Sequence, residues 1–389
     1  MVGTVVPSLL ISWSATFAIR RWAFRWGLVD RPATPSDTHQ HKTHQHITPL
    51  GGGIAIWAGV IVTFTVGQLL VIWIPTDANL SRYAPQLLLD HAEGLRSKAP
   101  ELWFLLLAAT LLMVLGLMDD LVHLGWRVRL ICQCAVAATG VCLFEHWKLT
   151  VYLDLPWVTG VLSIVWIVGL INAFNMLDNM DGLSAGVAAI ASVMLAATLL
   201  LVPEPGNAGP QLFVAAFLFV LAGSVMGFLW HNRPRAKIFM GDAGSYLVGF
   251  CIGVATILAT FAGYANSSSH TILAPICVMA VPFYDMVSVI IIRLYRGSSP
   301  FEADRSHFSH RLVDLGFSRA GAVLTIYLTT FICGLAGLLL HQVNGQGALL
   351  VMLLVFSILV MIGILETMAR QKVAARHDSS QDEDSDTSR

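Results

Sequence analysis

Charged side chains are scarce in this sequence. Lys, Arg, Asp and Glu make up 12% of its 389 residues, whereas a soluble domain has about 25%. Hydrophobic residues make up 56%, and no soluble fold covers so much apolar surface with so few charges. A soluble enzyme, a secreted disulfide-linked domain and a disordered chain are therefore excluded. The net charge of −1 gives no reason to expect nucleic acid as a partner.

Several short motifs are also missing. The six cysteines lie in apolar runs without a CxxC pair or a histidine at zinc-site spacing, so we expect them to be small core residues. The pattern GxxxxGK[ST] is absent, which gives no reason to expect an ATP site. The first apolar stretch is followed by Arg20 and Arg21 and lacks the small-residue cleavage site of a signal peptide. We therefore interpret this stretch as a retained helix.

Apolar runs fill most of the chain, and each is long enough to cross a membrane as a helix. The predicted spans are residues 2–19, 50–74, 102–118, 130–145, 157–177, 183–202, 211–230, 244–263, 271–293, 320–341 and 347–366. The sequence therefore predicts an all-α integral membrane protein with about eleven transmembrane helices in one domain, residues 1–369. Residues 370–389 are polar and acidic and are predicted to be a disordered cytoplasmic tail.

The basic residues orient this predicted topology. With the C-terminus in the cytoplasm, the cytoplasmic segments hold 19 of the 23 Lys and Arg residues and the outer segments hold four. Cytoplasmic loops carry such an excess in membrane proteins. We therefore expect an external N-terminus, a location in the inner (plasma) membrane, and any active site at the cytoplasmic face.

Acidic residues gather at the predicted cytoplasmic helix ends. Asp119 and Asp120 close one span, Asp178 and Asp181 follow another, and Asp242 opens a third. Adjacent carboxylates at the negative end of a helix dipole are unfavourable without a cation. Two interpretations stay open for Asp119 and Asp120: they hold a metal ion, or they simply end the helix in water.

The run of residues 172–182 carries amide or carboxylate side chains at every third position. Neighbours three apart, such as Asn175 and Asp178, share a helix face and can direct oxygens into one site. Hard oxygen ligands favour Mg²⁺, with Mn²⁺ as the alternative, and argue against zinc. A polar stripe between packed helices remains the structural alternative. Asp242 likewise fits either an N-cap for a helix starting near Ala243 or a metal or phosphate site.

Basic side chains in two cytoplasmic connections complete the predicted site. They are Lys42, His44, Arg305, His307, His310 and Arg311. Beside a carboxylate-bound metal ion, such groups stabilise phosphoryl oxygens during transfer. Taken singly, each is equally explained by the excess of positive charge in cytoplasmic loops.

Together these motifs resemble those of the polyprenyl-phosphate N-acetylhexosamine-1-phosphate transferases. The matching segments are residues 41–44 with 48–52, then 116–121, 172–182, 239–245, 281–285 and 304–310. The resemblance implies Mg²⁺-dependent transfer of a sugar-1-phosphate from a UDP-N-acetylhexosamine to undecaprenyl phosphate, releasing UMP. The loop after Lys42 resembles that of members that use UDP-N-acetylglucosamine.

The residues and the resemblance together predict a role for each candidate. Catalysis is assigned to Asp119, Asp120, His307 and His310, metal binding to Asn175 and Asp242, and substrate binding to Lys42, His44, Asp178, Asp181, Arg305 and Arg311. One position departs from the family. Its last motif ends in two adjacent histidines, and here Ser309 precedes His310.

Two other functions are kept as alternatives. The first is the family's cell-wall branch, which takes UDP-MurNAc-pentapeptide but carries a longer Gly-Thr-Pro-Thr-Met-Gly-Gly pattern where this chain reads Thr-Pro-Leu-Gly-Gly. The second is an ion-coupled transporter, which places ionisable groups near the bilayer midplane. Only Asp285 lies well inside a predicted span. A homodimer is compatible with the sequence.

Overall fold

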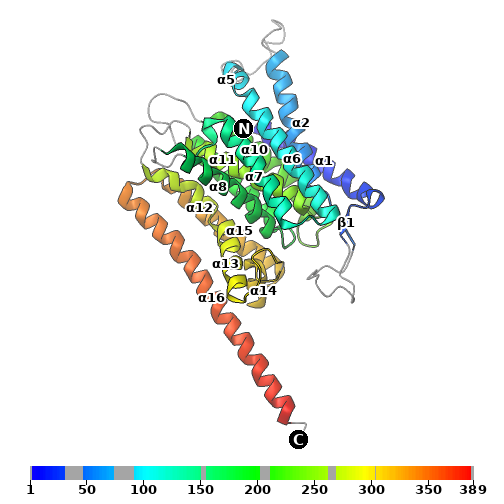
Figure 1. Cartoon of the computed structure of the whole chain (residues 1–389), viewed down its shortest axis with the longest axis vertical. Coiled ribbons are helices and arrows are strands. Elements are labelled where there is room, and N and C mark those ends of the chain that lie inside the picture. Colours follow the sequence, from blue (N-terminus) through cyan, green and yellow to red (C-terminus); the bar gives the residue numbers. More distant parts are fainter. Residues whose placement is uncertain are drawn as a thin grey trace.

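The computed structural model describes residues 2–30, 47–73, 92–149, 155–201, 211–261, 269–302 and 304–386, with side chains up to residue 368 in the last range. This part of the chain is almost entirely helical (Figure 1). The long helices are α1 Val2–Trp26, α2 Gly52–Trp73, α6 Ala99–Val122, α7 Trp126–Leu143, α8 Pro156–Leu177, α9 Leu183–Leu201, α10 Leu212–Asn232, α11 Gly241–Phe261, α13 Ala280–Tyr295, α15 Arg319–Leu339 and α16 Gly345–Asp386. The shorter elements are β1 Val29–Asp30, β2 Thr48–Pro49, α5 Ala92–Ser97, η1 Glu145–Trp147, η3 Ser269–Leu273, α12 Ala274–Val278 and α14 Phe308–Asp314.

Nine of the described helices are long and apolar enough to cross a membrane, namely α2, α6, α7, α8, α9, α10, α11, α15 and part of α16. The all-α integral membrane architecture predicted from the sequence agrees with this. Of the eleven predicted spans, residues 2–19 and 271–293 are outside these nine. The predicted span count and orientation therefore remain predictions.

The predicted span at residues 271–293 is not one helix, and in this respect the prediction was wrong. The segment is divided into η3, α12 and α13, with a break at Met279. Pro275 and Pro282 lie on either side of the break, and proline lacks the N–H that continues a helical hydrogen-bond ladder. Hydropathy does not register this loss, because both prolines stand in apolar sequence.

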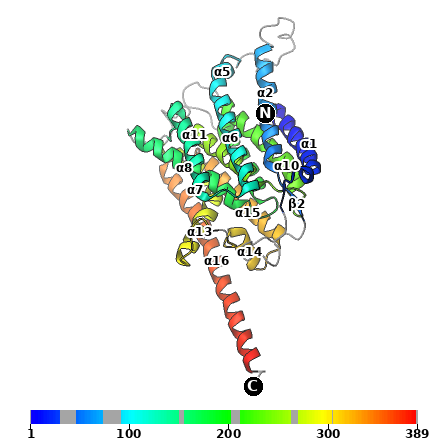
Figure 2. The same cartoon turned by 45° about the vertical axis from the view of Figure 1, so that its right-hand side comes forward.

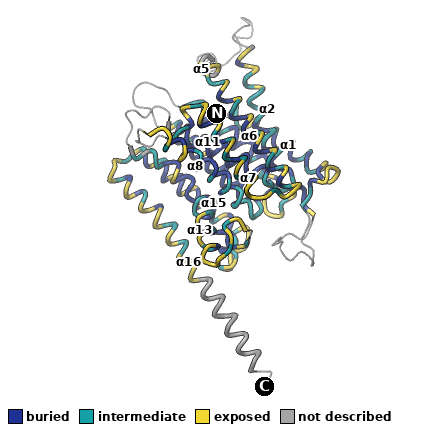
Figure 3. The backbone as a smooth tube through the Cα atoms, viewed as in Figure 1, coloured by how far each residue is buried: buried dark blue, intermediate teal, exposed yellow. Residues whose placement is uncertain are grey.

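Helix α11 is the centre of the bundle. It packs against α2, α6, α8, α9 and α10 and is almost completely buried, whereas α16 lies at the edge with most of its side chains exposed (Figure 3). Glycines permit the closest contacts. A Cβ atom at Gly53 would lie 2.2 Å from the backbone nitrogen of Gly244, and one at Gly116 would lie 2.3 Å from the carbonyl oxygen of Asp242. The start of α2 and the C-terminal part of α6 therefore lie directly against the start of α11.

Backbone pairing draws further segments to this end of the bundle. β1 and β2 pair antiparallel, with Asp30 opposite Thr48. The N–H of Gly52 donates to the carbonyl of Phe239, and the N–H of Phe239 donates to that of Pro49. The turn before α2 is thereby tied to the connection between α10 and α11. The strand pair, labelled β1 in Figure 1 and β2 in Figure 2, lies at the same end of the bundle as α14 and opposite α5.

The predicted disordered tail, residues 370–389, coincides with the end of α16 and residues 387–389. Its side chains lie outside the described part of the chain. The disorder of this tail remains a prediction.

Candidate active site

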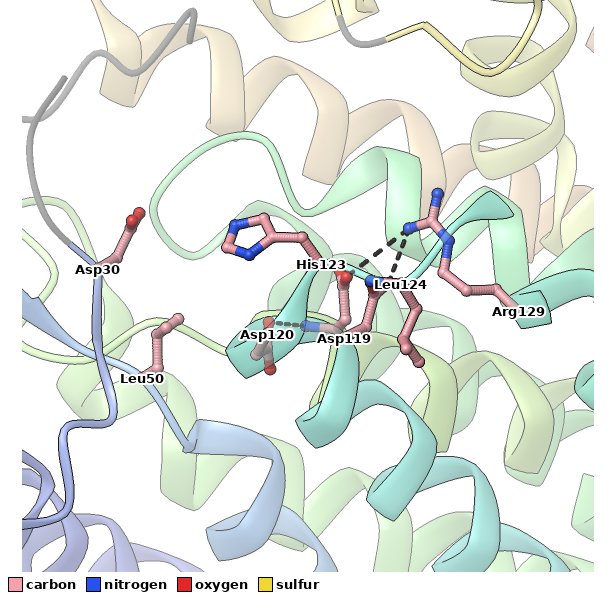
Figure 4. Close-up of a pocket in the computed structure, with 8 residues that line it drawn as sticks. Asp30, Leu50, Asp119, Asp120, His123, Leu124 and Arg129 are labelled. Atoms are coloured by element: carbon pink, nitrogen blue, oxygen red, sulfur yellow. Dashed lines mark hydrogen bonds and ion pairs between the residues drawn. The ribbon is translucent and has the colours of Figure 1, made fainter. Parts of the chain in front are cut away.

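A pocket of about 380 Å³ opens at the end of the bundle where these segments meet (Figure 4). It is lined by Asp30, Leu50, Asp119, Asp120, His123, Leu124, Arg129 and Asp242. These residues come from the turns around β1 and β2, the end of α6, the start of α7 and the start of α11. Three of the predicted site residues, Asp119, Asp120 and Asp242, thus share one pocket.

Asp120 caps the N-terminus of α11 from a neighbouring helix. Its Oδ1 accepts the N–H of Asp242 at 2.9 Å and its Oδ2 accepts the N–H of Ala243 at 3.2 Å. Gly241 precedes these donors with φ +71°, and a Cβ atom there would lie 2.5 Å from Asp120 Oδ2. Glycine is therefore required by both the backbone conformation and the space. Because Asp120 satisfies these donors, the alternative role of Asp242 as the helix cap is not needed, and its carboxylate is available to the pocket.

Asp119 is buried and anchors Arg129. Its Oδ1 accepts the N–H of Leu124 at 2.8 Å, and its Oδ2 accepts Arg129 Nη1 at 2.7 Å and the hydroxyl of Tyr246 at 2.9 Å. Sequence reasoning missed Arg129, which it counted only as one of the cytoplasmic basic residues. The available signal was a cation ten residues after Asp119, across a short turn between two spans.

Asn175 brings the polar run of α8 to the same place. Its Nδ2 donates to Asp242 Oδ1 at 2.6 Å and to Ser245 Oγ at 3.1 Å. Asp178 lies just beyond, where its carboxylate accepts the N–H of Gly241. Burial, with the negative charge of nearby Asp120, raises the pKa of Asp178 to about 7. Asp181 instead accepts the N–H of Ala236 at 2.9 Å and ties the loop to the α10–α11 connection.

These carboxylates and amides suit a magnesium ion. The carboxylates of Asp119 and Asp242 are in direct contact, and two carboxylates this close repel each other unless a proton or a cation lies between them. Asn175 and Asp242 offer hard oxygens at that point. In the part of the chain that is described, no three His, Cys, Asp or Glu side chains form a complete metal site. Mg²⁺ typically takes only one or two carboxylates and completes its shell with water and substrate phosphates.

Of the two predicted catalytic histidines, His307 directly precedes the neighbouring α14 and His310 is within it, and neither is among the residues that line the pocket. Their ring centres are 6.4 Å apart. Burial, with the nearby His307 and Arg305, lowers the pKa of His310 to about 4, so its imidazole is neutral at neutral pH. Ser309, at the position that departs from the family, donates to Asn179 Oδ1 and joins α14 to the loop that carries Asp178.

The two arginines of this segment have different surroundings. Arg305 is exposed, whereas Arg311 is 3% exposed. The Nε of Arg311 lies 2.8 Å from Glu366 Oε2 on α16, and its Nη2 donates to Ser288 Oγ. The guanidinium that was predicted to bind substrate thus holds α14 against α13 and α16. Lys42 and His44 lie outside the described residues.

Replacing Glu366 with Gln should destabilise the protein, because it leaves the buried guanidinium of Arg311 facing a neutral amide. We expect the free energy of unfolding to fall by about 3 kcal/mol, the lower end of the range for a broken buried ion pair. Unfolding of the purified protein in mixed micelles measures this. The matched control Glu145→Gln breaks an exposed pair with Lys148 and should change stability by less than about 0.5 kcal/mol. Unchanged stability with weaker substrate binding would return Arg311 to the binding site.

Known proteins resemble this chain over most of its length. The sequence profile of glycosyl transferase family 4 matches residues 102–260. The probable undecaprenyl-phosphate N-acetylglucosaminyl 1-phosphate transferase of Bacillus subtilis is 30% identical over 348 residues, 88% of this chain and 85% of that protein. The decaprenyl-phosphate N-acetylglucosaminephosphotransferase of Mycolicibacterium smegmatis is 31% identical over 346 residues, 83% of this chain and 78% of that protein. The undecaprenyl-phosphate alpha-N-acetylglucosaminyl 1-phosphate transferase of Escherichia coli K12 is 30% identical over 339 residues, 83% of this chain and 79% of that protein.

The family resemblance inferred from the motifs is confirmed by these similarities. The family profile covers most of the segment from α6 to α11, which carries the pocket residues Asp119, Asp120, His123, Leu124, Arg129 and Asp242. The chain therefore belongs to glycosyl transferase family 4 and is a multi-pass membrane sugar-1-phosphate transferase of the polyprenyl-phosphate type.

Proposed function

We propose that this protein transfers N-acetylglucosamine-1-phosphate from UDP-N-acetylglucosamine to undecaprenyl phosphate. The products are undecaprenyl diphosphate N-acetylglucosamine and UMP, and the reaction would begin the assembly of a cell-envelope polysaccharide. The names of relatives aligned over most of their length support the acceptor and the sugar. The observation that carries the proposal is the convergence of Asp119, Asp120, Asn175 and Asp242 with Arg129 at one end of the helix bundle.

The reaction joins two anions that repel each other. An oxygen of the lipid phosphate forms a bond to the phosphorus that carries the sugar, and the bond from that phosphorus to UMP breaks. A magnesium ion, when bound, neutralises charge on the diphosphate. The protein's part is mainly to position the reactants. A phosphate monoester is largely ionised near neutral pH, so the attacking oxygen needs no general base.

Each pocket residue has a separate part in this scheme. Asp242 and Asn175 would hold the metal ion at the start of α11. Asp120 fixes that start by accepting two of its backbone N–H groups. Asp119 holds Arg129 through Nη1, and the remaining donors of the guanidinium face a phosphate oxygen. Arginine suits this task because its donors match the geometry of phosphate.

The pocket is proposed to face the cytoplasm, where UDP-sugars are available. The segments at this end of the bundle include the connections that hold most of the Lys and Arg residues. Inversion of the topology would place these basic segments outside. In the proposed orientation the protein lies in the inner (plasma) membrane, with the lipid phosphate at the level of the pocket.

Purified protein in detergent or lipid, supplied with undecaprenyl phosphate and one UDP-sugar at a time, tests the proposal. We expect UMP release and a glycolipid of the corresponding mass with UDP-N-acetylglucosamine, and neither when Mg²⁺ is chelated. Activity only with UDP-N-acetylgalactosamine would change the sugar, and activity only with UDP-MurNAc-pentapeptide would move the protein to the cell-wall branch. No UMP with any of these donors would overturn the proposal.

A further inference from the structure

Asp285 is a completely buried carboxylate that the proposed mechanism does not use. It lies in the second turn of α13 and has no exposed surface. Its Oδ1 accepts the N–H of Phe308 at 2.6 Å, and its Oδ2 lies 3.0 Å from His307 Nδ1. The one ionisable side chain found well inside a predicted span is therefore directed at the N-terminus of α14. This arrangement removes the argument for a transporter that its position in the sequence offered.

The pairing with Asp285 fixes the state of the His307 ring. A carboxylate accepts hydrogen bonds and donates none, so the Nδ1 of His307 must carry the proton. In a neutral ring this leaves Nε2 with a free lone pair, and in a charged ring it leaves Nε2 as an N–H donor. Because the backbone N–H of Phe308 binds the same carboxylate, the position of the ring is also tied to the start of α14.

The second ring nitrogen of His307 is available to a ligand. Nε2 makes no hydrogen bond to the described part of the chain and is not one of its enclosed, unpartnered polar atoms. Only the Nδ1 side of the ring is committed to the protein.

Direct contacts connect this histidine to the acidic pocket. Ser309, two residues after His307, donates to Asn179. Asp178, which precedes Asn179 in the sequence, accepts the N–H of Gly241, and Gly241 adjoins Asp242. A shift of α14 would therefore reach the loop at the start of α11 through two hydrogen bonds. A stacked pair, Trp126 and Phe301 at 4.1 Å between ring centres, joins the segment before α14 to the start of α7.

We infer that Asp285 is a positioning residue for sugar-phosphate transfer, which holds His307 with Nδ1 protonated so that Nε2 meets the phosphorylated reactants. The inference rests on the proposed function. Asp285 itself does not touch substrate. It acts through His307, as the carboxylate partners of catalytic and metal-bound histidines do when they set the tautomer and orientation of the ring.

Asp285→Asn tests this inference because it keeps the shape of the side chain and an oxygen for the Phe308 N–H but presents an NH₂ group to His307. The ring must then accept at Nδ1 and carry its proton on Nε2. We expect kcat to fall by about 10–100-fold, the usual effect of removing such a partner, with KM within about threefold of the wild type. In a His307→Ala background the same change should have no further effect, because residues that act as a unit are not additive.

Controls separate this result from misfolding and from failure of the proposed function. Asp314→Asn makes the same chemical change at an exposed position of α14 and should leave kcat unchanged. Wild-type protein without transferase activity would contradict the proposed function and not this inference. Full activity of Asp285→Asn, or a further loss in the His307→Ala background, would overturn the inference. If Asp285→Asn does not fold, ¹⁵N-histidine spectra of wild type, assigned with His307→Gln, decide it: a proton on Nε2 alone would contradict the proposed pairing.

Discussion

Replacing Asp242 with Asn is expected to lower kcat for sugar-phosphate transfer by about 10²–10³-fold, as the loss of one preorganised electrostatic contact in an active site does. The carboxylate of Asp242 is not needed as a helix cap, because Asp120 from α6 has that role. Asparagine keeps the shape of the side chain but removes the negative charge that would hold Mg²⁺. UMP release measured over a series of Mg²⁺ concentrations should show both a lower kcat and a higher metal requirement.

The stability of the same variant distinguishes loss of chemistry from loss of fold. Asp242 contacts the carboxylate of Asp119, so in the absence of metal the variant should melt at or above the temperature of the wild type, because one repelling charge is gone. Glu145→Gln, at an exposed pair elsewhere on the molecule, should leave both activity and metal requirement unchanged. Wild-type activity of Asp242→Asn at limiting Mg²⁺ would remove this residue from the metal site.

Much of the fold could be predicted from the sequence, because a bilayer imposes a minimum length and an apolar composition on every spanning helix. Nine of the predicted spans correspond to helices whose ends differ from the predicted ones by a few residues. The prediction of one helix at residues 271–293 was wrong because the break arises in the backbone hydrogen bonding. Two prolines remove hydrogen-bond donors without lowering the hydropathy. Asp285 lies in α13, the helix that follows the break, and there it contacts the start of α14.

The candidate site was predictable where the signal was local. Charged side chains are disfavoured in a membrane, so acids at helix ends stand out, and the structure brings Asp119, Asp120 and Asp242 into one pocket with Asn175 bound to the last of them. The division of roles between these acids was not predictable. Which carboxylate caps α11 depends on the contact of Gly116 with the backbone of Asp242, and these positions are far apart in the sequence.

Long-range partners also explain the residues whose surroundings differ from expectation. Arg311 has the sequence context of a substrate-binding cation, and the carboxylate that it meets, Glu366, is on α16, which begins only at Gly345. Asp285 belonged to a recognised motif without an assigned role, because the significance of its carboxylate depends on His307 lying opposite. Charge and spacing along one chain do not specify such pairs.

Replacing Arg129 with Ala should lower kcat/KM by about 10³-fold, an effect comparable to removing an arginine that stabilises a transferring phosphoryl group. All hydrogen bonds of its guanidinium to the described residues leave from Nη1, toward Asp119 and Tyr246. The other nitrogens point away from Asp119 at the pocket (Figure 4). Nη1 also lies 3.9 Å from Asp242 Oδ2, so the substitution removes the cation next to both acids and the donors available to phosphate.

Arg129→Lys separates these two effects. Lysine can restore a charge beside Asp119, but its ammonium cannot hold the carboxylate and bind phosphate with a second set of planar donors. Recovery of the melting temperature without recovery of kcat/KM would therefore assign the phosphate contact to the guanidinium, whereas recovery of both would mean that its charge alone matters. Lys148→Ala, which breaks an exposed pair with Glu145, is the control for loss of a cation. Activity of Arg129→Ala within about fivefold of the wild type would limit Arg129 to a structural role.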